Sequence, residues 1–289
     1  MSDRQSVAVI SGGTKGIGLE IARFLASQGW RIGICSRSGS EATEVSIDIT
    51  REFGVSSVGS ATDVANPSAV DAFAQIVRRD LGRPRLVICN AAILGPVGGP
   101  TDASPEDWAA ALHVNVSGVY NMINAFWEDV TSQPDGRIIT MSGGGVGGPR
   151  PLRKTTAYVA SKAALASLVE TLSYEMQDTS STINSIAPGA VPTTFMDGVL
   201  RAGRDLAGDD LFADAASRIG QSTRGTLADF FRLLTFVISP QSRNISGRTL
   251  SARWNNPEEL AASDQLAEDI NLYRLRRIDN QLFTGEVKE

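Results

Sequence analysis

A short apolar run that ends in glycines constrains the fold of this chain more than any other stretch. Residues 6–11 (SVAVIS) have the composition of a buried strand, and residues 19–28 have the apolar spacing of an amphipathic helix. Between them lies the turn Gly12-Gly13-Thr14-Lys15-Gly16-Ile17-Gly18. Glycines at a strand-to-helix turn let the backbone approach a pyrophosphate, and the helix N-terminus supplies free N–H groups. The turn therefore favours a nucleotide site, with an ordinary strand–helix connection as the alternative.

The alternation of strand and helix continues along the chain and indicates a doubly wound α/β fold. Further strand-like runs lie at residues 31–36, 56–61, 86–89, 137–142, 182–187 and 244–250, and helical stretches at residues 67–81, 108–130 and 155–177. Strands joined by such helices predict a parallel, Rossmann-type sheet covered on both faces, with ligands at the carboxyl ends of the strands. We expect one domain over residues 1–254, with a substrate lid at about 194–225, and a helical C-terminal tail over residues 255–289.

The composition excludes several classes of protein. The chain has 289 residues, of which 42% are hydrophobic and 20% charged, so it can bury a sizeable core and is not disordered. Its net charge is -5 without a long basic run, which leaves no footprint for a nucleic acid. The apolar runs are short and the N-terminus has no signal-peptide pattern, so we expect a cytoplasmic protein without a membrane partner. His113 is the only histidine, and Cys35 and Cys89 form no CxxC pair, so no metal site is expected.

The end of the second strand bears on the choice of cofactor. Dinucleotide-binding folds place an acidic residue near this point to bond the ribose 2′-hydroxyl, or a basic residue to accommodate a 2′-phosphate. This chain has Ser36 and Arg37 here, and Lys15 of the glycine turn can face the same region. The pattern favours NADP(H) over NAD(H), unless Arg37 is simply solvated.

A tyrosine and a lysine are the clearest candidates for proton chemistry. Tyr158 and Lys162 lie four residues apart in a stretch without proline or glycine, residues 155–165, that is typical of a helix. On a helix this spacing puts both side chains on one face, about 6 Å apart at Cβ. A neighbouring ammonium group favours the phenolate and lowers the pKa of the tyrosine, which can then donate and accept a proton near neutral pH. Taken alone, the pair also fits a half-buried tyrosine beside a solvated lysine.

Six motifs in a fixed order make residues 6–250 resemble the short-chain dehydrogenase/reductase family. They are the glycine turn, Asp63-Val64, Asn90-Ala91-Ala92, Asn115, the Tyr158 and Lys162 pair, and Pro188-Gly189. The resemblance implies that Tyr158 is the acid/base, that Lys162 binds the nicotinamide-side ribose and lowers the tyrosine pKa, and that Asn115 holds a water in a proton relay. It also implies a homo-oligomer, a dimer or tetramer, formed through the helices that carry Asn115 and Tyr158.

The same resemblance assigns the cofactor contacts. The expected cofactor-binding residues are Gly12, Thr14, Lys15, Gly16, Ile17, Gly18, Ser36, Arg37, Asp63, Val64, Asn90, Ala91, Tyr158, Lys162, Pro188, Gly189, Val191 and Thr193. Among them, the glycines would hold the pyrophosphate, Asp63 and Val64 would meet the adenine, and residues 188–193 would line the nicotinamide. In the family's strand order, Cys35 and Cys89 would lie two strand spacings apart, about 9.6 Å, which exceeds the reach of a disulfide.

The chain departs from the family pattern beside the expected acid/base. Most members carry a serine pair after strand five, and the second serine bonds the substrate carbonyl; here the pair reads Ser142-Gly143. Either Ser142 supplies the hydroxyl through a shifted backbone, or Thr140, a loop N–H or the substrate itself does so. We therefore count Ser142 with Tyr158, Lys162 and Asn115 as the expected catalytic residues.

Further departures lie towards the C-terminus. The usual glycine-rich ending of the last strand is replaced by residues 251–256 (SARWNN), and a tail with helix-like stretches at residues 258–270 and 272–278 follows. The predicted lid contains several arginines, and we expect Arg150, Arg153 and Lys154 to lie across the cleft from them. These cations either bind an anionic substrate or are solvated. Similar loop and tail patterns occur in family members linked with sugar or secondary metabolism.

These features together predict what the chain does. We expect an NADP(H)-dependent oxidoreductase that interconverts a secondary alcohol and a ketone on a small molecule, sugar-derived or a secondary metabolite. An epimerase or dehydratase that uses the cofactor transiently is one alternative. A cofactor-binding protein without catalysis, suggested by the missing second serine, is the other.

Overall fold

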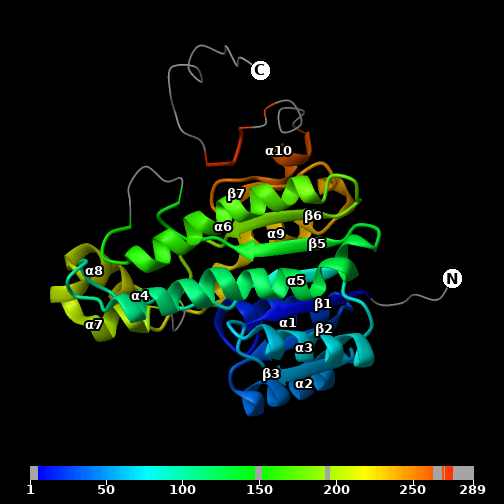
Figure 1. Ribbon diagram of the computed structural model, residues 1–289, viewed down its shortest axis with the longest axis horizontal. Helices are drawn as coiled ribbons and strands as arrows, with labels where there is room; N and C mark the ends of the chain where they lie inside the picture. The colour runs from blue at the N-terminus through cyan, green and yellow to red at the C-terminus, as the bar shows by residue number, and fades with distance from the viewer. Residues whose placement is uncertain (1–5, 147–151, 193–195, 263–268, 270, 276–289) are drawn as a thin grey trace.

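Seven parallel strands form one sheet in the part of the chain that the structure describes, in the order β3-β2-β1-β4-β5-β6-β7 (Figure 1). The structure is a computed structural model and describes residues 6–146, 152–192, 196–262, 269 and 271–275. The strands are β1 (Val7–Ser11), β2 (Arg31–Ser36), β3 (Ser57–Ala61), β4 (Leu86–Cys89), β5 (Arg137–Met141), β6 (Thr182–Ala187) and β7 (Thr249–Ser251). This order confirms the predicted doubly wound sheet.

Helices cover both faces of the sheet and bury a separate apolar layer on each. The helices α1 (Gly16–Ser27), α2 (Gly39–Phe53) and α9 (Ala228–Val237) cover one face, and α3 (Pro67–Asp80), α5 (Gly118–Thr131) and α6 (Thr156–Glu175) cover the other. Alternate residues of a strand point to opposite faces, so Ile10 of β1 joins the first layer and Val9 joins the second. Both layers contain packed rings, such as Phe24 stacked on Phe231 with centroids 4.4 Å apart.

The sheet also fixes the two cysteines. Cys35 is the β2 partner of Ser11, and Cys89 follows Ile88, which pairs with Ile10 on the other side of β1. Both are buried free thiols, and burial raises the pKa of each to about 12. They therefore serve as packing residues.

Several segments can be compared with the sequence-based expectation. The long helix predicted over residues 108–130, with interruptions at Asn115 and Gly118, is interrupted there: α4 (Pro105–Leu112) is followed by a π-helical turn η1 (His113–Ser117) and by α5, which begins at Gly118. The strand predicted at residues 244–250 is reduced to β7, where the backbone bonds β6 over only three residue pairs. The tail begins with α10 (Pro257–Ala262), but residues 272–275 form a turn instead of the predicted helix. The other tail residues expected to be helical, 263–268, 270 and 276–278, lie outside the described residues.

The predicted lid is helical. α7 (Asp197–Ala207) and α8 (Asp209–Ser217) lie beyond one end of the sheet, next to α4 in Figure 1. Gly203, with φ of 78°, interrupts the helical geometry inside α7. Two short 3-10 turns, η2 (Arg224–Thr226) and η3 (Pro240–Ser242), flank α9. Among the described residues, no helix is long and apolar enough to cross a membrane.

Candidate active site

A cleft of about 1590 Å³ runs along the carboxyl ends of the strands. Its walls come from the glycine turn, the segments after the strands and the α7–α8 lid. The predicted site residues that line it are Gly12, Thr14, Lys15, Gly16, Ile17, Ser36, Arg37, Asp63, Val64, Asn90, Ala91, Ser142, Tyr158, Lys162, Pro188, Gly189 and Val191. Gly18 and Asn115 do not line the cleft, and Thr193 lies outside the described residues.

The glycine turn combines left-handed glycines with a helix N-terminus that has no side-chain cap. Gly12 and Gly16 adopt φ of 65° and 55°, in the left-handed region that favours glycine. A Cβ on Gly18 would lie 2.2 Å from the carbonyl oxygen of Gly12, so the first turn of α1 packs directly on the loop. Lys15, the N-cap residue of α1, makes no side-chain cap hydrogen bond within the described chain. The N–H groups and the positive end of the helix dipole therefore remain available to a ligand in the cleft.

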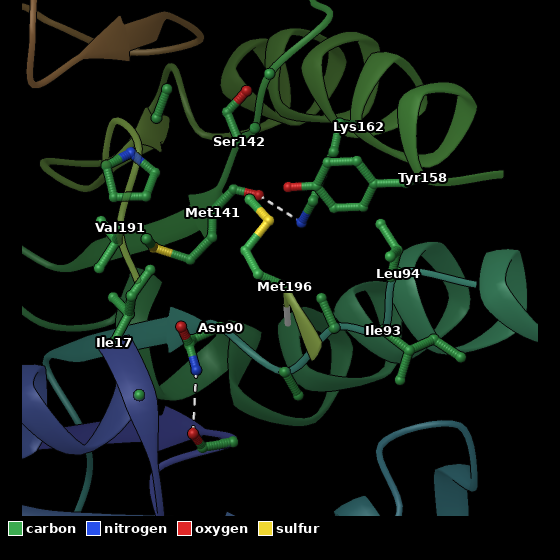
Figure 2. A pocket seen from close by; sticks show the side chains of 18 of the residues that line it. Ile17, Asn90, Ile93, Leu94, Met141, Ser142, Tyr158, Lys162, Val191 and Met196 are labelled. Atoms are coloured by element: carbon green, nitrogen blue, oxygen red, sulfur yellow. Dashed lines mark hydrogen bonds between the residues drawn. The ribbon is translucent and has the colours of Figure 1, made fainter. Parts of the chain in front are cut away.

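Asn90 braces this turn from the end of β4. Its Nδ2 donates to the carbonyl oxygens of Ser11 (3.0 Å) and Gly12 (3.1 Å), as Figure 2 shows in part. Its backbone N–H donates to Ser11 Oγ at 3.0 Å. The amide thus fixes the loop at the bottom of the cleft by bonding protein groups, in addition to lining the cleft.

The end of β2 presents both signs of charge. Arg37 and Lys15 are exposed and line the cleft here. Ser38 caps α2 by accepting a hydrogen bond from the backbone N–H of Glu41, and the Glu41 carboxylate accepts one from Thr14 Oγ1 at 3.3 Å. Glu41 was not among the predicted site residues, although a serine followed three residues later by a glutamate is a capping signature.

Asp63 and Val64, the residues expected to meet the adenine, line the cleft after β3. The Asp63 carboxylate accepts a hydrogen bond from the backbone N–H of Ala65 at 3.0 Å, so it stabilises its own turn. Val64 is 6% exposed, and its carbonyl oxygen accepts a hydrogen bond from Asn121 Nδ2 of α5. A Cβ on Gly118 would lie 2.7 Å from Val64 Cγ2, which explains why a glycine begins α5. The segment is thus held firmly against α5.

Tyr158 and Lys162 project together from α6 into the cleft. Lys162 Nζ donates a 2.8 Å hydrogen bond to the carbonyl oxygen of Met141 at the end of β5. It lies 5.5 Å from the centroid of the Tyr158 ring. In Figure 2 the phenol oxygen and the ammonium group both face this carbonyl, with Met196 close by. The i and i+4 spacing therefore places the two groups as the sequence predicts.

The expectation of a lowered Tyr158 pKa beside Lys162 is wrong for this structure, because burial has the larger effect. Burial raises the pKa of Tyr158 to about 12 and lowers that of Lys162 to about 8. Both shifts have the same cause, because a low-dielectric environment penalises the phenolate and the ammonium ion alike. Tyr158 is consequently a protonated phenol over the whole neutral range.

Asn115 lies behind the cleft wall, in the π-helical turn. It is fully buried, and its Oδ1 accepts a hydrogen bond from the N–H of Ile93 at 2.8 Å. Its Nδ2 donates to the carbonyl oxygen of Ile93 (2.8 Å) and to Ser161 Oγ (3.1 Å). Both amide donors are thus used within the protein, and the side chain holds the segment after β4 against α6. A π-helical turn at such a residue is a frequent feature of functional sites.

The residues at the end of β5 limit which hydroxyl can replace that of the missing serine beside Tyr158. Thr140 is fully buried and donates to Ser185 Oγ at 2.9 Å inside the sheet, so it does not face the cleft. Ser142 is 5% exposed and lines the cleft, and its N–H donates to the carbonyl oxygen of Ile186 at 2.9 Å. The Ser142 hydroxyl and a backbone N–H of the loop after β5 therefore remain as the protein groups that can hydrogen-bond the substrate oxygen.

The lid closes an apolar region around Tyr158. Leu94 and Val199 are buried here, and Met196 and Leu211 pack against them together with the tyrosine ring. Arg201 is exposed on α7 and lines the cleft, whereas Arg218 is bonded to Asp214. Arg153 and Lys154 do not line the cleft, and Arg150 lies outside the described residues.

The tail supplies a wall that the sequence did not reveal. Residues 273–275 line the cleft together with Arg253 and Trp254. The tail is held against the edge of the sheet, since Thr249 N–H donates to the carbonyl oxygen of Tyr273 at 2.7 Å. Arg274 donates to the carbonyl oxygens of Ser246 and Gly247, both at 3.3 Å. Main-chain contacts of this kind leave no signal in the sequence.

Comparisons with known proteins agree with this geometry. A family model described as short chain dehydrogenase matches residues 6–205. The short-chain reductase protein NovJ of Streptomyces niveus is 28% identical over 255 residues, 88% of this chain and 95% of NovJ. The solved structure of L-sorbose reductase from Gluconobacter frateurii, complexed with NADPH and L-sorbose, has a TM-score of 0.72 and 26% identity, and covers 86% of this chain and 94% of its own. A short chain dehydrogenase from Burkholderia cenocepacia, in complex with NADP, has a TM-score of 0.69 and 26% identity over 86% of this chain and 97% of its own.

Proposed function

The chain belongs to the short-chain dehydrogenase family, and from this premise we propose that it interconverts a secondary alcohol and a ketone with NADP(H). One observation carries the proposal. The Tyr158 hydroxyl and the Lys162 ammonium group face the same cleft as the glycine turn and the N-terminus of α1. A proton donor and an anion site on one cleft suit the reduction of a carbonyl by a dinucleotide.

The residues of the cleft fit a dinucleotide. The glycine turn has no space for a side chain at Gly18, and the uncapped N-terminus of α1 favours a pyrophosphate. We assign the adenine end to Asp63 and Val64, and the nicotinamide end to Lys162 and to residues 188–191. When bound, the nicotinamide cofactor supplies the hydride chemistry.

We infer that NADP(H) is preferred because of the charges at the end of β2. Arg37 and Lys15 are exposed cations there, and the N-terminus of α2 adds a positive dipole end. Glu41 brings a negative charge, but its carboxylate already accepts a hydrogen bond from Thr14. The relatives solved with NADPH and with NADP support the same choice.

Tyr158 is the proton donor in the reducing direction. Its hydroxyl proton would pass to the carbonyl oxygen of the substrate, and the bound cofactor would supply the hydride that completes the alcohol. The positive charge of Lys162 stabilises the phenolate left behind. In the oxidising direction the phenolate takes the proton back. We assign Ser142, which lines the cleft, to hold the substrate oxygen, and Asn115 to position the wall segment at Ile93.

The substrate side of the cleft suits a small molecule with an apolar part. Leu94, Met196 and Leu211 surround Tyr158, and Arg201 offers a cation at the rim. We propose a ketone or hydroxy compound that is sugar-derived or a secondary metabolite, and the L-sorbose reductase relative supports the first of these. Residues 273–275 of the tail form a wall of the cleft, as part of a C-terminal extension of the domain.

The test is net cofactor turnover with a panel of ketones and polyols. The proposal predicts that NADPH is consumed in proportion to the alcohol formed. An epimerase or dehydratase would form product while the NADPH absorbance stays constant. A binding protein without catalysis would bind NADPH and form no product with any substrate.

We also propose a cytoplasmic homo-oligomer that assembles through α5 and α6. These helices carry the exposed aromatic residues Tyr120 (51% exposed) and Tyr174 (46% exposed). Light scattering on the wild type and on Tyr120→Ser tests the assembly. A monomeric wild type would contradict it.

A further inference from the structure

Gly143 lies where a side chain would collide with the proton donor. A Cβ placed on Gly143 would lie 2.0 Å from the Tyr158 hydroxyl oxygen and 2.7 Å from Tyr158 Cζ. Carbon and oxygen atoms that are not bonded do not approach so closely, so any residue other than glycine would force a movement. The space that a side chain at position 143 would fill is occupied by the phenol itself.

The collision concerns the end of one side chain and not the backbone. The atoms nearest to the added Cβ all belong to the Tyr158 ring and hydroxyl. The ring can turn away at a modest cost to the fold, but its new position would move the hydroxyl from its place beside Met141 and Lys162. The neighbouring position differs, because a Cβ on Gly144 would meet only Leu152 Cδ2, at an ordinary distance of 3.8 Å.

We propose that Gly143 is a positioning residue, whose missing side chain allows the Tyr158 hydroxyl to lie at the end of β5. The inference rests on the proposed function, since it assumes that this hydroxyl is the proton donor. Gly143 stands at the second position of the family's serine pair, and the inference gives this position the opposite role in this chain. Instead of supplying a hydroxyl to the substrate, position 143 must be empty.

The serine variant separates this inference from its rival. If Gly143 were only a serine that the chain has lost, Gly143→Ser would restore a hydrogen bond to the substrate oxygen and raise kcat. If the phenol needs the space, Gly143→Ser and Gly143→Ala both displace it and lower kcat. A misplacement of about 1 Å in a reacting group costs roughly 100-fold in rate.

The experiment compares Gly143→Ala, Gly143→Ser and the matched control Gly144→Ala. For both Gly143 variants we expect an unchanged Tm, unchanged NADPH affinity by fluorescence titration, and kcat lower by about 100-fold. The loss should fall on kcat with an unchanged KM for NADPH, which separates a displaced proton donor from a damaged fold. The control should keep kcat, Tm and NADPH affinity.

Any of three results would overturn the inference. They are wild-type or higher kcat in Gly143→Ser, a lower Tm or lost NADPH binding in Gly143→Ala, and an equal loss of kcat in the control. Tyr158→Phe, measured in parallel, distinguishes the failure of this inference from that of the proposed function. An inactive Tyr158→Phe with fully active Gly143 variants rejects only the role of Gly143, whereas an active Tyr158→Phe rejects the proposed function.

Discussion

Lys162 Nζ donates a 2.8 Å hydrogen bond to the carbonyl oxygen of Met141, so the strand end of β5 holds the ammonium group at the cleft. Lys162 is only 4% exposed, and the bond returns part of the solvation that its burial removes. The contact also fixes the distance between the cation and the Tyr158 ring. The proton donor and its cation are thus oriented by the backbone of the sheet.

Burial of Lys162 predicts a pH-dependent stability. Its pKa is about 8 in the folded protein and 10.5 as the ordinary value, so the unfolded chain binds more protons between these pH values. The free energy of unfolding therefore rises with pH through this window, and below it the folded protein bears the cost of a buried charge. From about pH 7 to about pH 9, we expect wild type to gain about 1 kcal/mol relative to Lys162→Met.

Denaturant unfolding of both proteins at the two pH values measures this difference. The thiols and Tyr158 titrate in both proteins, so their effects cancel in the comparison. Parallel pH dependence in wild type and Lys162→Met would show that the ammonium group is not destabilised by burial.

Arg37→Asp tests the cofactor preference. The variant removes a cation from the end of β2 and adds a negative charge, which would repel a 2′-phosphate but accept a ribose 2′-hydroxyl. We expect NADPH to bind at least 10-fold more weakly and NADH to bind nearly as before, because a lost charge-assisted hydrogen bond costs about 1.5–3 kcal/mol. Arg51→Asp, an equal charge change at the far end of α2, is the control. Equal losses for NADPH and NADH would reject the role of Arg37.

Gly18→Ala tests the fit of the pyrophosphate turn. The added methyl would lie 2.2 Å from the Gly12 carbonyl oxygen and 2.5 Å from Asn90 Nδ2, which cannot both withdraw without opening the loop. We expect a loss of about 1–3 kcal/mol of stability, typical of overpacking, together with loss of cofactor binding. Gly225→Ala, where the nearest atom is 3.7 Å away, is the control. Normal cofactor affinity in Gly18→Ala would contradict the assignment.

Arg274→Ala tests the tail as a wall of the cleft. The guanidinium group donates to two backbone carbonyls just before β7, at Ser246 and Gly247, and to the hydroxyl of Tyr174 at 3.2 Å. Without it, we expect faster proteolysis of the C-terminal segment and a higher KM for substrate, at nearly unchanged Tm. An unchanged KM together with faster proteolysis would show that the tail does not contribute to substrate binding. Arg253→Ala, in the same wall but exposed, is the matched variant.

The sheet could be predicted because buried parallel strands are short apolar runs between turn residues. α2 escaped prediction because its exposed face is polar and few large apolar residues mark the buried one, although Ser38 and Gly54 mark its ends. Two parts of the candidate site could be predicted because residue type and spacing are enough to indicate their use. They are the glycine turn and the Tyr158 and Lys162 pair.

Other properties of the site depend on contacts that the sequence does not display. The raised pKa of Tyr158 arises because residues from other elements, such as Leu94 and Met196, exclude water from its ring. Desolvation then outweighs the nearby cation, the reverse of what spacing suggests. The collision at Gly143 likewise requires the actual path of the loop after β5.

The central claim is that the Tyr158 hydroxyl delivers the proton in an NADPH-dependent reduction. The most direct measurement is the rate of NADPH oxidation by Tyr158→Phe with the best ketone of the panel, alongside its NADPH affinity. The variant loses one oxygen and keeps the ring that packs against the lid, so we predict intact NADPH binding and a rate reduced by at least 100-fold, as expected for loss of a general acid. Turnover at the wild-type rate with bound NADPH would contradict the account.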